Sequence, residues 1–180
     1  IRDYAIKIDA NLIVMGSKGV SDFEEMIIGS NTEKVVRTSN IPVIVVKTNT
    51  NKFKFKKLIF ASNYDDENKV AFKDFLAFAK KFNSQIHLLK INTVSNFESS
   101  YATHKKIKNF IKDFDIQRKT ITIYNDESVV KGITNFAKEI DADLISLTTH
   151  GRSGLSSLFN GSIAKSVSKN VLRPVITFKI

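Results

Sequence analysis

The sequence has no cysteine and no tryptophan among its 180 residues. The lack of cysteine excludes disulfide bonds, thiol catalysis and cysteine-based metal sites. No apolar run approaches the roughly 18 residues of a membrane-spanning helix, and residues 1–4 do not open a signal peptide. We therefore expect a soluble, cytoplasmic protein without a membrane partner. Because residue 1 is not methionine, we interpret the chain as a fragment of a longer protein.

Acidic residues are also scarce, since the sequence has 18 Asp and Glu but 28 Lys and Arg, which gives a formal net charge of +10. A positive excess suits anionic partners. The lysines, however, lie in two separate groups, one around residues 47–57 and one on a polar helix face at 105–112. No signature of an RNA-binding domain or of a recognition helix accompanies them. The distribution favours solvated surface lysines over nucleic-acid binding.

The most informative feature present is an internal repeat. Residues 1–48 align without a gap on residues 133–180 at a constant offset of 132, and sixteen of these 48 positions are identical. Residues 49–132 have no upstream counterpart. A repeat of this kind predicts two copies of one fold. We expect a C-terminal remnant of a first domain at 1–48, a polar linker at 49–54 and a complete second domain at 55–180.

Apolar residues alternate between strand-like and helix-like spacing along the complete copy. We expect strands at 58–61, 86–91, 120–124, 143–148 and 175–178, and helices around 72–82, 107–114, 129–140 and 163–171. In the incomplete copy we expect a helix end at 1–8, a strand at 12–15, a helix at 30–38 and a strand at 43–47. Alternating strands and helices predict an α/β fold, with a parallel sheet covered on both faces.

A glycine-rich loop follows the penultimate strand of each copy. In the first copy it contains Gly16, Gly19 and Gly29, with Ser30 at the start of a helix. Glycine lets the backbone approach a ligand closely, and a helix N-terminus attracts phosphate. A plain βα turn with a serine cap explains the same residues, so both interpretations stay open. The equivalent positions in the second copy are Thr148, Gly151, Gly161 and Ser162.

These loops carry a family resemblance. The segment DLISLTTHGRSGLSSLFNGSIAKSVSKNVLRPVITF resembles the C-terminal half of a universal stress protein domain, and KKLIFASNYDDEN is similar to that family's first strand and loop. The resemblance implies a Rossmann-like open parallel five-stranded sheet of order 3-2-1-4-5, with helices on both faces, plus a partial copy of the same fold. It also implies that the last strands, 43–47 and 175–179, pair antiparallel as an intramolecular pseudo-dimer, or that the chain forms a homo-oligomer.

Some members of the family bind ATP, so the resemblance implies ATP with Mg²⁺ as the candidate ligand. The implied nucleotide-binding positions of the second copy are Ser62, Asn63, Ile91, Thr148, Gly151, Arg152, Gly161 and Ser162. Asn63 stands where ATP-binding members usually carry Asp, and Thr148 replaces the first glycine. An amide is a weaker acceptor than a carboxylate, so we expect these changes to weaken ATP binding by about one or two orders of magnitude.

Catalysis has little support in the sequence. His87, His104 and His150 are not paired with an evident nucleophile or a metal-binding cluster. The acidic run 65–67 fits a helix start better than a catalytic or metal site. A non-enzymatic stress-response module that dimerises is therefore favoured, with a slow ATP-hydrolysing or nucleotide-dependent regulatory enzyme as the alternative.

Overall fold

The computed structural model describes residues 1–17, 29–47, 54–149, 162–170 and 173–180. The chain divides into two compact units, one of residues 1–52 and 147–180 and one of residues 53–146. We call them the first and the second unit and describe each by itself. Strand β6 (Leu144–Thr149) runs from the second unit into the first. This division follows spatial contacts and differs from the domain boundaries expected from the repeat, which stay a prediction.

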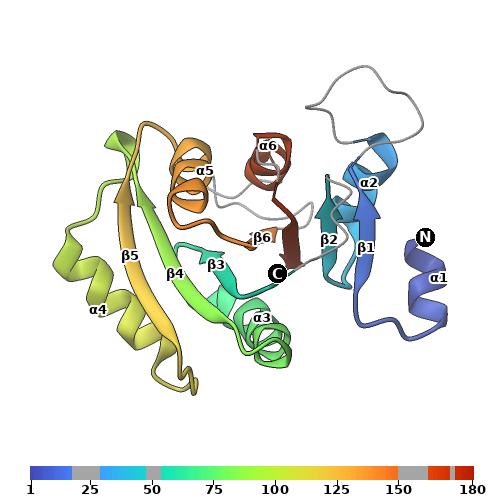
Figure 1. The fold of residues 1–180 in the computed structure, drawn as a ribbon, viewed down its shortest axis with the longest axis horizontal. Coiled ribbons are helices and arrows are strands. Elements are labelled where there is room, and N and C mark those ends of the chain that lie inside the picture. Colours follow the sequence, from blue (N-terminus) through green and yellow to red (C-terminus); the bar gives the residue numbers. More distant parts are fainter. Residues whose placement is uncertain (18–28, 48–53, 150–161, 171–172) are drawn as a thin grey trace. The chain divides into compact units, whose positions relative to one another are not determined.

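The second unit is a parallel sheet with helices on both faces (Figure 1). Its strands are hydrogen-bonded in the order β6-β3-β4-β5, and Phe60 of β3 lies opposite Leu88 of β4 and Ser146 of β6. The α/β fold expected from the sequence is therefore present. The elements are β3 (Lys57–Ala61), a 3-10 turn η1 (Asp66–Asn68), α3 (Lys69–Lys81), β4 (Gln85–Asn92), a 3-10 turn η2 (Val94–Asn96), α4 (Ser100–Ile111), β5 (Lys119–Asn125) and α5 (Val129–Glu139).

Phenylalanine fills the core of the second unit. Phe60 of β3 packs on Phe72 and Phe75 of α3 at ring-centroid distances of 4.8 and 5.2 Å, and Phe72 packs on Phe110 of α4 at 5.2 Å. All four side chains are fully buried. Edge-to-face and tilted ring pairs stabilise a core beyond the area they bury. The helices α3 and α4 are therefore fixed on one face of the sheet by aromatic packing.

The first unit contains α1 (Arg2–Lys7), β1 (Ile13–Gly16), α2 (Ser30–Thr38), β2 (Val43–Val46), α6 (Ser162–Asn170) and β7 (Val175–Lys179). Strands β1 and β2 are parallel, and β2 pairs antiparallel with β7, with Ile44 opposite Ile176. This is the antiparallel pairing of the last strands that the resemblance implies. A small core of Ala5, Ile13, Val35, Val43 and Val45 holds α1 and α2 on the strands.

The two copies of the repeat end their first shared helix in the same way. Asp9 and Asp141, at equivalent positions, both have left-handed backbone angles, with φ of 51° and 52°. The next residues, Ala10 and Ala142, each donate a backbone hydrogen bond of 2.9 Å to the residue five positions earlier. This pattern closes a helix with a left-handed residue, where Asp and Asn are tolerated better than most side chains. The sequence repeat thus corresponds to a repeated local structure.

The acidic run 65–67 lies at a helix start, as the sequence pattern predicts, because the 3-10 turn η1 leads directly into α3. Asp65 precedes the short turn η1 without a side-chain capping bond, and α3 begins at Lys69. The carboxylates instead pair with lysines: Asp66 with Lys69 at 2.8 Å and Asp65 with Lys106 at 2.7 Å.

Within the described residues, no helix has the length and apolar character needed to cross a membrane.

Candidate functional site

Three of the expected binding residues lie at one edge of the second unit. Strand β3 ends at Ala61, which lies opposite Leu89 of the parallel strand β4. Ser62 and Asn63 follow β3 directly, and Ile91 lies near the end of β4. The carboxyl ends of parallel strands are the usual place for ligands in open α/β sheets. The register therefore brings Ser62, Asn63 and Ile91 to the edge where a ligand is expected.

Ser62 shapes the turn after β3. Its hydroxyl oxygen accepts a 2.9 Å hydrogen bond from the backbone N–H of Tyr64, which has a left-handed φ of 61°. The Tyr64 hydroxyl in turn donates to the Phe60 carbonyl at 3.0 Å, and both Ser62 and Tyr64 are buried. Burial raises the pKa of Tyr64 well above its ordinary value. Ser62 thus stabilises a strained turn that presents the next polar side chain, Asn63.

The side chain of Asn63 accepts a hydrogen bond from a buried lysine. The Lys90 ammonium, on β4, donates to the Asn63 side-chain carbonyl at a distance of 3.3 Å. Lys90 is only 4% exposed, whereas Asn63 is partly exposed. A lysine in a strand is rarely buried unless it is paired. Sequence reasoning missed Lys90, although one signal was available: it is the only charged residue in the apolar run 86–91.

Burial and three neighbouring charges act on Lys90. Burial lowers the pKa of Lys90, and the nearby positive charge of Lys106 lowers it further, while the carboxylates of Glu98 and Asp65 act in the opposite direction. Lys106 is itself paired with Asp65. The burial effect is the largest of these, because an ammonium loses hydration that a single 3.3 Å hydrogen bond replaces only in part.

Ile91 is enclosed by helix α5. Its side chain is 5% exposed and packs against Gly132, where an added Cβ would lie only 2.8 Å from the Ile91 Cγ2 atom. On the same face of β4, His87 packs on Phe136 of α5 at a centroid distance of 6.1 Å. Glycine at position 132 therefore lets α5 lie close on β4. Ile91 is therefore an apolar residue beneath α5 near the end of β4. Asn63 is the accessible polar group at this edge of the sheet.

The described ends of the first-copy loop lie next to one another in the first unit. The backbone N–H of Gly29 donates to the Ser17 carbonyl at 2.8 Å, and the Thr32 hydroxyl donates to the Gly16 carbonyl at 2.9 Å. Gly29 is the N-cap of α2, with no side-chain capping bond, and Ser30 opens the helix. The structure thus brings Gly16, Gly29 and Ser30 together beside the N-terminus of a helix, a setting that favours anions.

The equivalent loop of the second copy is described only at its ends. Thr148 lies in β6 and is buried, and the neighbouring Thr149 hydroxyl donates to the Phe178 carbonyl at 3.5 Å. The candidate residues Gly19, Gly151, Arg152 and Gly161, together with His150 and linker residues 49–53, lie outside the described residues. So does the side chain of Ser162, although its backbone begins α6.

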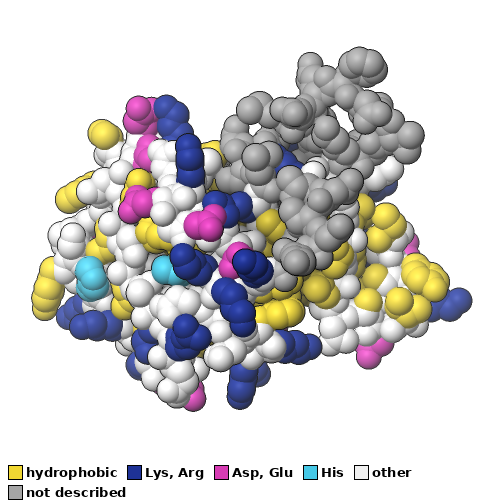
Figure 2. Space-filling model, in the orientation of Figure 1, with side chains coloured by type: hydrophobic (Ala, Val, Ile, Leu, Met, Phe, Trp, Pro, Cys, Tyr) yellow, Lys and Arg dark blue, Asp and Glu magenta, His cyan; other side chains and the backbone are white. Residues whose placement is uncertain are grey.

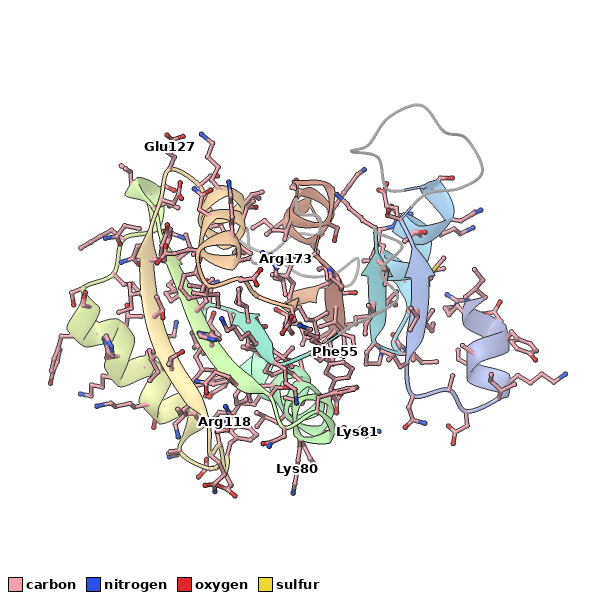
Figure 3. All side chains as sticks on the ribbon, viewed as in Figure 1. Phe55, Lys80, Lys81, Arg118, Glu127 and Arg173 are labelled. Carbon is pink, nitrogen blue, oxygen red and sulfur yellow. The ribbon has the colours of Figure 1, made fainter. Side chains whose placement is uncertain are left out.

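Some basic side chains of the second unit lie at the end of the sheet opposite this edge. Figure 3 shows Lys80, Lys81 and Arg118 at the end of the sheet where β4 and β5 begin, and Glu127 at the opposite end, where β5 leads into α5. On the face in Figure 2, Lys and Arg side chains are interspersed with acidic and neutral groups. Among the residues that the structure covers, no group of three or more His, Cys, Asp or Glu could hold a metal ion.

The remaining histidines of the described part serve local structure. The His87 ring nitrogen Nδ1 shares a 2.9 Å hydrogen bond with the Thr120 hydroxyl on β5. Burial, and then the nearby charge of Lys57, lowers the pKa of His87. His104 is exposed on α4 and contacts the Ser100 carbonyl at 2.8 Å. His87 lies on the strand face covered by α5 and His104 on the outer surface of α4.

Comparison with known proteins gives a consistent result. The model of the universal stress protein family matches residues 1–47 and 54–179. Universal stress protein MJ0531 of Methanocaldococcus jannaschii is 27% identical over 143 residues, which are 69% of this chain and 82% of that protein. Universal stress protein MJ0577 of the same organism is 49% identical over 37 residues, 21% of this chain and 23% of that protein.

Solved structures show the same fold. The crystal structure of a universal stress protein from Archaeoglobus fulgidus has a TM-score of 0.71 at 22% identity, covering 99% of this chain and 63% of its own length. This chain thus spans less than two thirds of that protein. The crystal structure of a universal stress protein in complex with cAMP has a TM-score of 0.55 at 15% identity, covering 71% of this chain and 97% of its own.

Proposed function

The chain belongs to the universal stress protein family, and on that premise we propose that it is a stress-response module that binds an adenine nucleotide weakly and associates with a second copy of itself. The observation that carries the nucleotide part is Asn63, a partly exposed amide at the carboxyl edge of β3. The resemblance of this loop to the family's ribose-binding position supports adenine nucleotides, and a family structure is named as a complex with cAMP.

Weak binding is supported by the chemistry at Asn63. A carboxylate at this position would accept two hydrogen bonds from a ribose diol, whereas the carbonyl of Asn63 is already engaged by Lys90. The loss of one or two charge-assisted contacts raises a dissociation constant by about 10- to 100-fold. In the first unit, Gly16, Gly29 and the N-terminus of α2 fit a phosphate chemically, because backbone N–H groups and the helix dipole favour anions.

Isothermal titration with ATP, with and without Mg²⁺, and with cAMP tests the nucleotide part. We expect saturable heat with dissociation constants above the low micromolar range. Asn63→Ala should weaken binding, while Asn109→Ala should not, because Asn109 is an exposed residue on α4. No heat with either nucleotide, or unchanged affinity in Asn63→Ala, would contradict this proposal.

Self-association is supported by apolar side chains of the first unit that are exposed to solvent. Tyr4 and Val14 are 66% and 63% exposed, whereas their repeat equivalents in the second copy, Phe136 and Ser146, are 4% and 0% exposed. In the second unit Phe136 packs on Tyr124 of β5 at 5.6 Å. Figure 2 shows hydrophobic side chains gathered over α1. An apolar patch of this kind is typical of a surface that another protein covers.

Sedimentation velocity over a range of concentrations tests self-association. We expect the wild-type chain to form dimers or larger species, and Val14→Asp to shift it toward monomer. Val70→Asp is the matched control, since Val70 is 70% exposed on α3 of the second unit, and it should leave the distribution unchanged. A monodisperse wild-type monomer at high concentration would contradict the proposal.

A further inference from the structure

The contact between Lys90 and Asn63 determines which hydrogen-bonding group the edge offers to a ligand. An ammonium has three donors and no acceptor, so the amide atom that lies 3.3 Å from the Lys90 Nζ atom is the carbonyl oxygen. The usual ambiguity between the oxygen and nitrogen of an asparagine side chain is thereby removed by chemistry.

The amide nitrogen of Asn63 is left for the ligand. The oxygen and nitrogen of a planar amide diverge from one carbon, so the NH₂ group points away from Lys90. Among the described residues, the structure gives the Asn63 nitrogen no hydrogen-bond partner, and the residue is partly exposed. Asn63 therefore presents donors at the position where an aspartate would present acceptors.

The electrostatic setting strengthens this reversal. Asparagine lacks the negative charge that an aspartate would have at this position. The Lys90 ammonium is also hydrogen-bonded to the oxygen of the Asn63 amide. Of the two carboxylates that act on Lys90, Asp65 is paired with Lys106, and Glu98 accepts from the Thr103 hydroxyl at 3.3 Å. The group next to the ligand edge is thus an amide donor that is polarised by a hydrogen-bonded ammonium, which favours a ligand group that accepts hydrogen bonds.

We propose that the Asn63–Lys90 pair makes the second unit select a phosphate-esterified ribose oxygen, as in a 3′,5′-cyclic nucleotide, over a free ribose 2′,3′-diol. This ligand choice rests on the proposed nucleotide-binding function. The esterified 3′ oxygen and the phosphoryl oxygens can only accept hydrogen bonds, which matches the Asn63 NH₂ group. A free hydroxyl can also accept from this group, but its own O–H donor finds no acceptor there because Lys90 occupies the Asn63 oxygen. A carboxylate at the same position would repel the phosphate and would accept from the free diol instead.

Titration with cAMP and 5′-AMP tests the selection, because both contain adenosine monophosphate but only 5′-AMP has a free 2′,3′-diol. We expect the wild-type protein to bind cAMP at least about tenfold tighter than 5′-AMP. Asn63→Asp should reduce this ratio by at least about tenfold, because the new carboxylate repels the cyclic phosphate and accepts from the diol. Asn109→Asp, on the outer face of α4, adds the same charge and should leave the ratio unchanged.

A measurement without ligand tests the contact itself. In ¹⁵N spectra, Lys90→Met should shift the side-chain amide signals of Asn63 and leave those of Asn109 in place. Unshifted Asn63 signals, or an Asn63→Asp ratio equal to that of wild type, would overturn the inference while leaving nucleotide binding intact. If neither nucleotide binds the wild-type protein, the proposed function is wrong and the ligand choice falls with it.

Discussion

Substitution of Gly132 by alanine should destabilise the protein, although alanine is the better helix former. Gly132 lies inside α5 and faces Ile91 of β4. An added Cβ would lie 2.8 Å from the Ile91 Cγ2 atom, 2.9 Å from its Cδ1 atom and 3.1 Å from the Cβ atom of Asp126. Ordinary contacts between carbon atoms lie at about 3.5–4.0 Å. The new methyl group would therefore overlap its neighbours by up to about 1 Å.

The expected size of the effect follows from two opposing contributions. Replacing glycine by alanine in a helix interior gains about 1 kcal/mol. Overpacking a close-packed site costs about 1–3 kcal/mol, and relief here requires a rotation about χ1 of Ile91, because its Cγ2 atom is attached directly to Cβ. Ile91 is β-branched and almost fully buried, so this rotation is restricted. The difference between these contributions predicts that Gly132→Ala lowers the free energy of unfolding by up to about 2 kcal/mol.

A double-mutant cycle in urea, followed by circular dichroism, measures this directly. Ile91→Ala removes both overlapping atoms and should by itself cost about 2–5 kcal/mol. In that background Gly132→Ala should become stabilising by about 1 kcal/mol, which gives a coupling of about 1–3 kcal/mol between the two positions. The difference between Lys138→Ala and Lys138→Gly, on the exposed face of α5, calibrates the helix contribution. A stabilising Gly132→Ala in the wild-type background, or the same effect in both backgrounds, would refute the reasoning.

Three other changes have outcomes that the structure specifies. Asp143→Ala should lower the free energy of unfolding by about 2–3 kcal/mol, because one Asp143 carboxylate oxygen accepts from the backbone N–H groups of Lys56 and Lys57 at 2.7 and 2.8 Å. In urea titrations, the stability of Asp143→Asn should lie between those of Asp143→Ala and wild type. Ser128→Ala should cost about 1 kcal/mol in the same assay, since its hydroxyl caps α5, and Ser128→Asp should restore most of the loss. Burial lowers the pKa of His87 below 6.5, so on acidification the unfolded chain binds a proton that the folded chain does not. The free energy of unfolding should therefore fall as the pH decreases below about 6.5. His87→Gln should reduce this dependence of stability on pH, and an unchanged dependence would contradict the role given to His87.

The α/β character and most elements could be predicted from the sequence because apolar spacing fixes which residues face the core. Strands expected at 58–61 and 175–178 are observed at Lys57–Ala61 and Val175–Lys179, and the helix expected at 129–140 is α5, Val129–Glu139. The acidic run 65–67 predicts a helix start, and the structure has the 3-10 turn η1 there, which leads directly into α3 at Lys69. Asp65 and Asp66 have the chemistry of a helix start, but their carboxylates pair with Lys106 and Lys69.

The candidate site could be predicted by position but not by orientation. The motif brings Ser62, Asn63 and Ile91 to the carboxyl ends of neighbouring strands, which depends only on strand order and direction. The buried contact of Lys90 with Asn63 depends on which face of β4 lies under α4, and the sequence does not specify it. A lysine within an apolar strand was the available signal. The Ser62 hydroxyl bonds to the Tyr64 backbone because Tyr64 has a left-handed backbone conformation, which no residue pattern in the sequence predicts.

The most direct test of the central claim is a ¹⁵N-resolved titration of the protein with cAMP. The account predicts saturable changes in the side-chain amide signals of Asn63 and in the backbone signals of residues 62–64. The signals of residues 116–118, which directly precede β5 at the opposite end of the sheet, should keep their positions. Saturable changes confined to residues 116–118, or no changes at millimolar nucleotide, would contradict it.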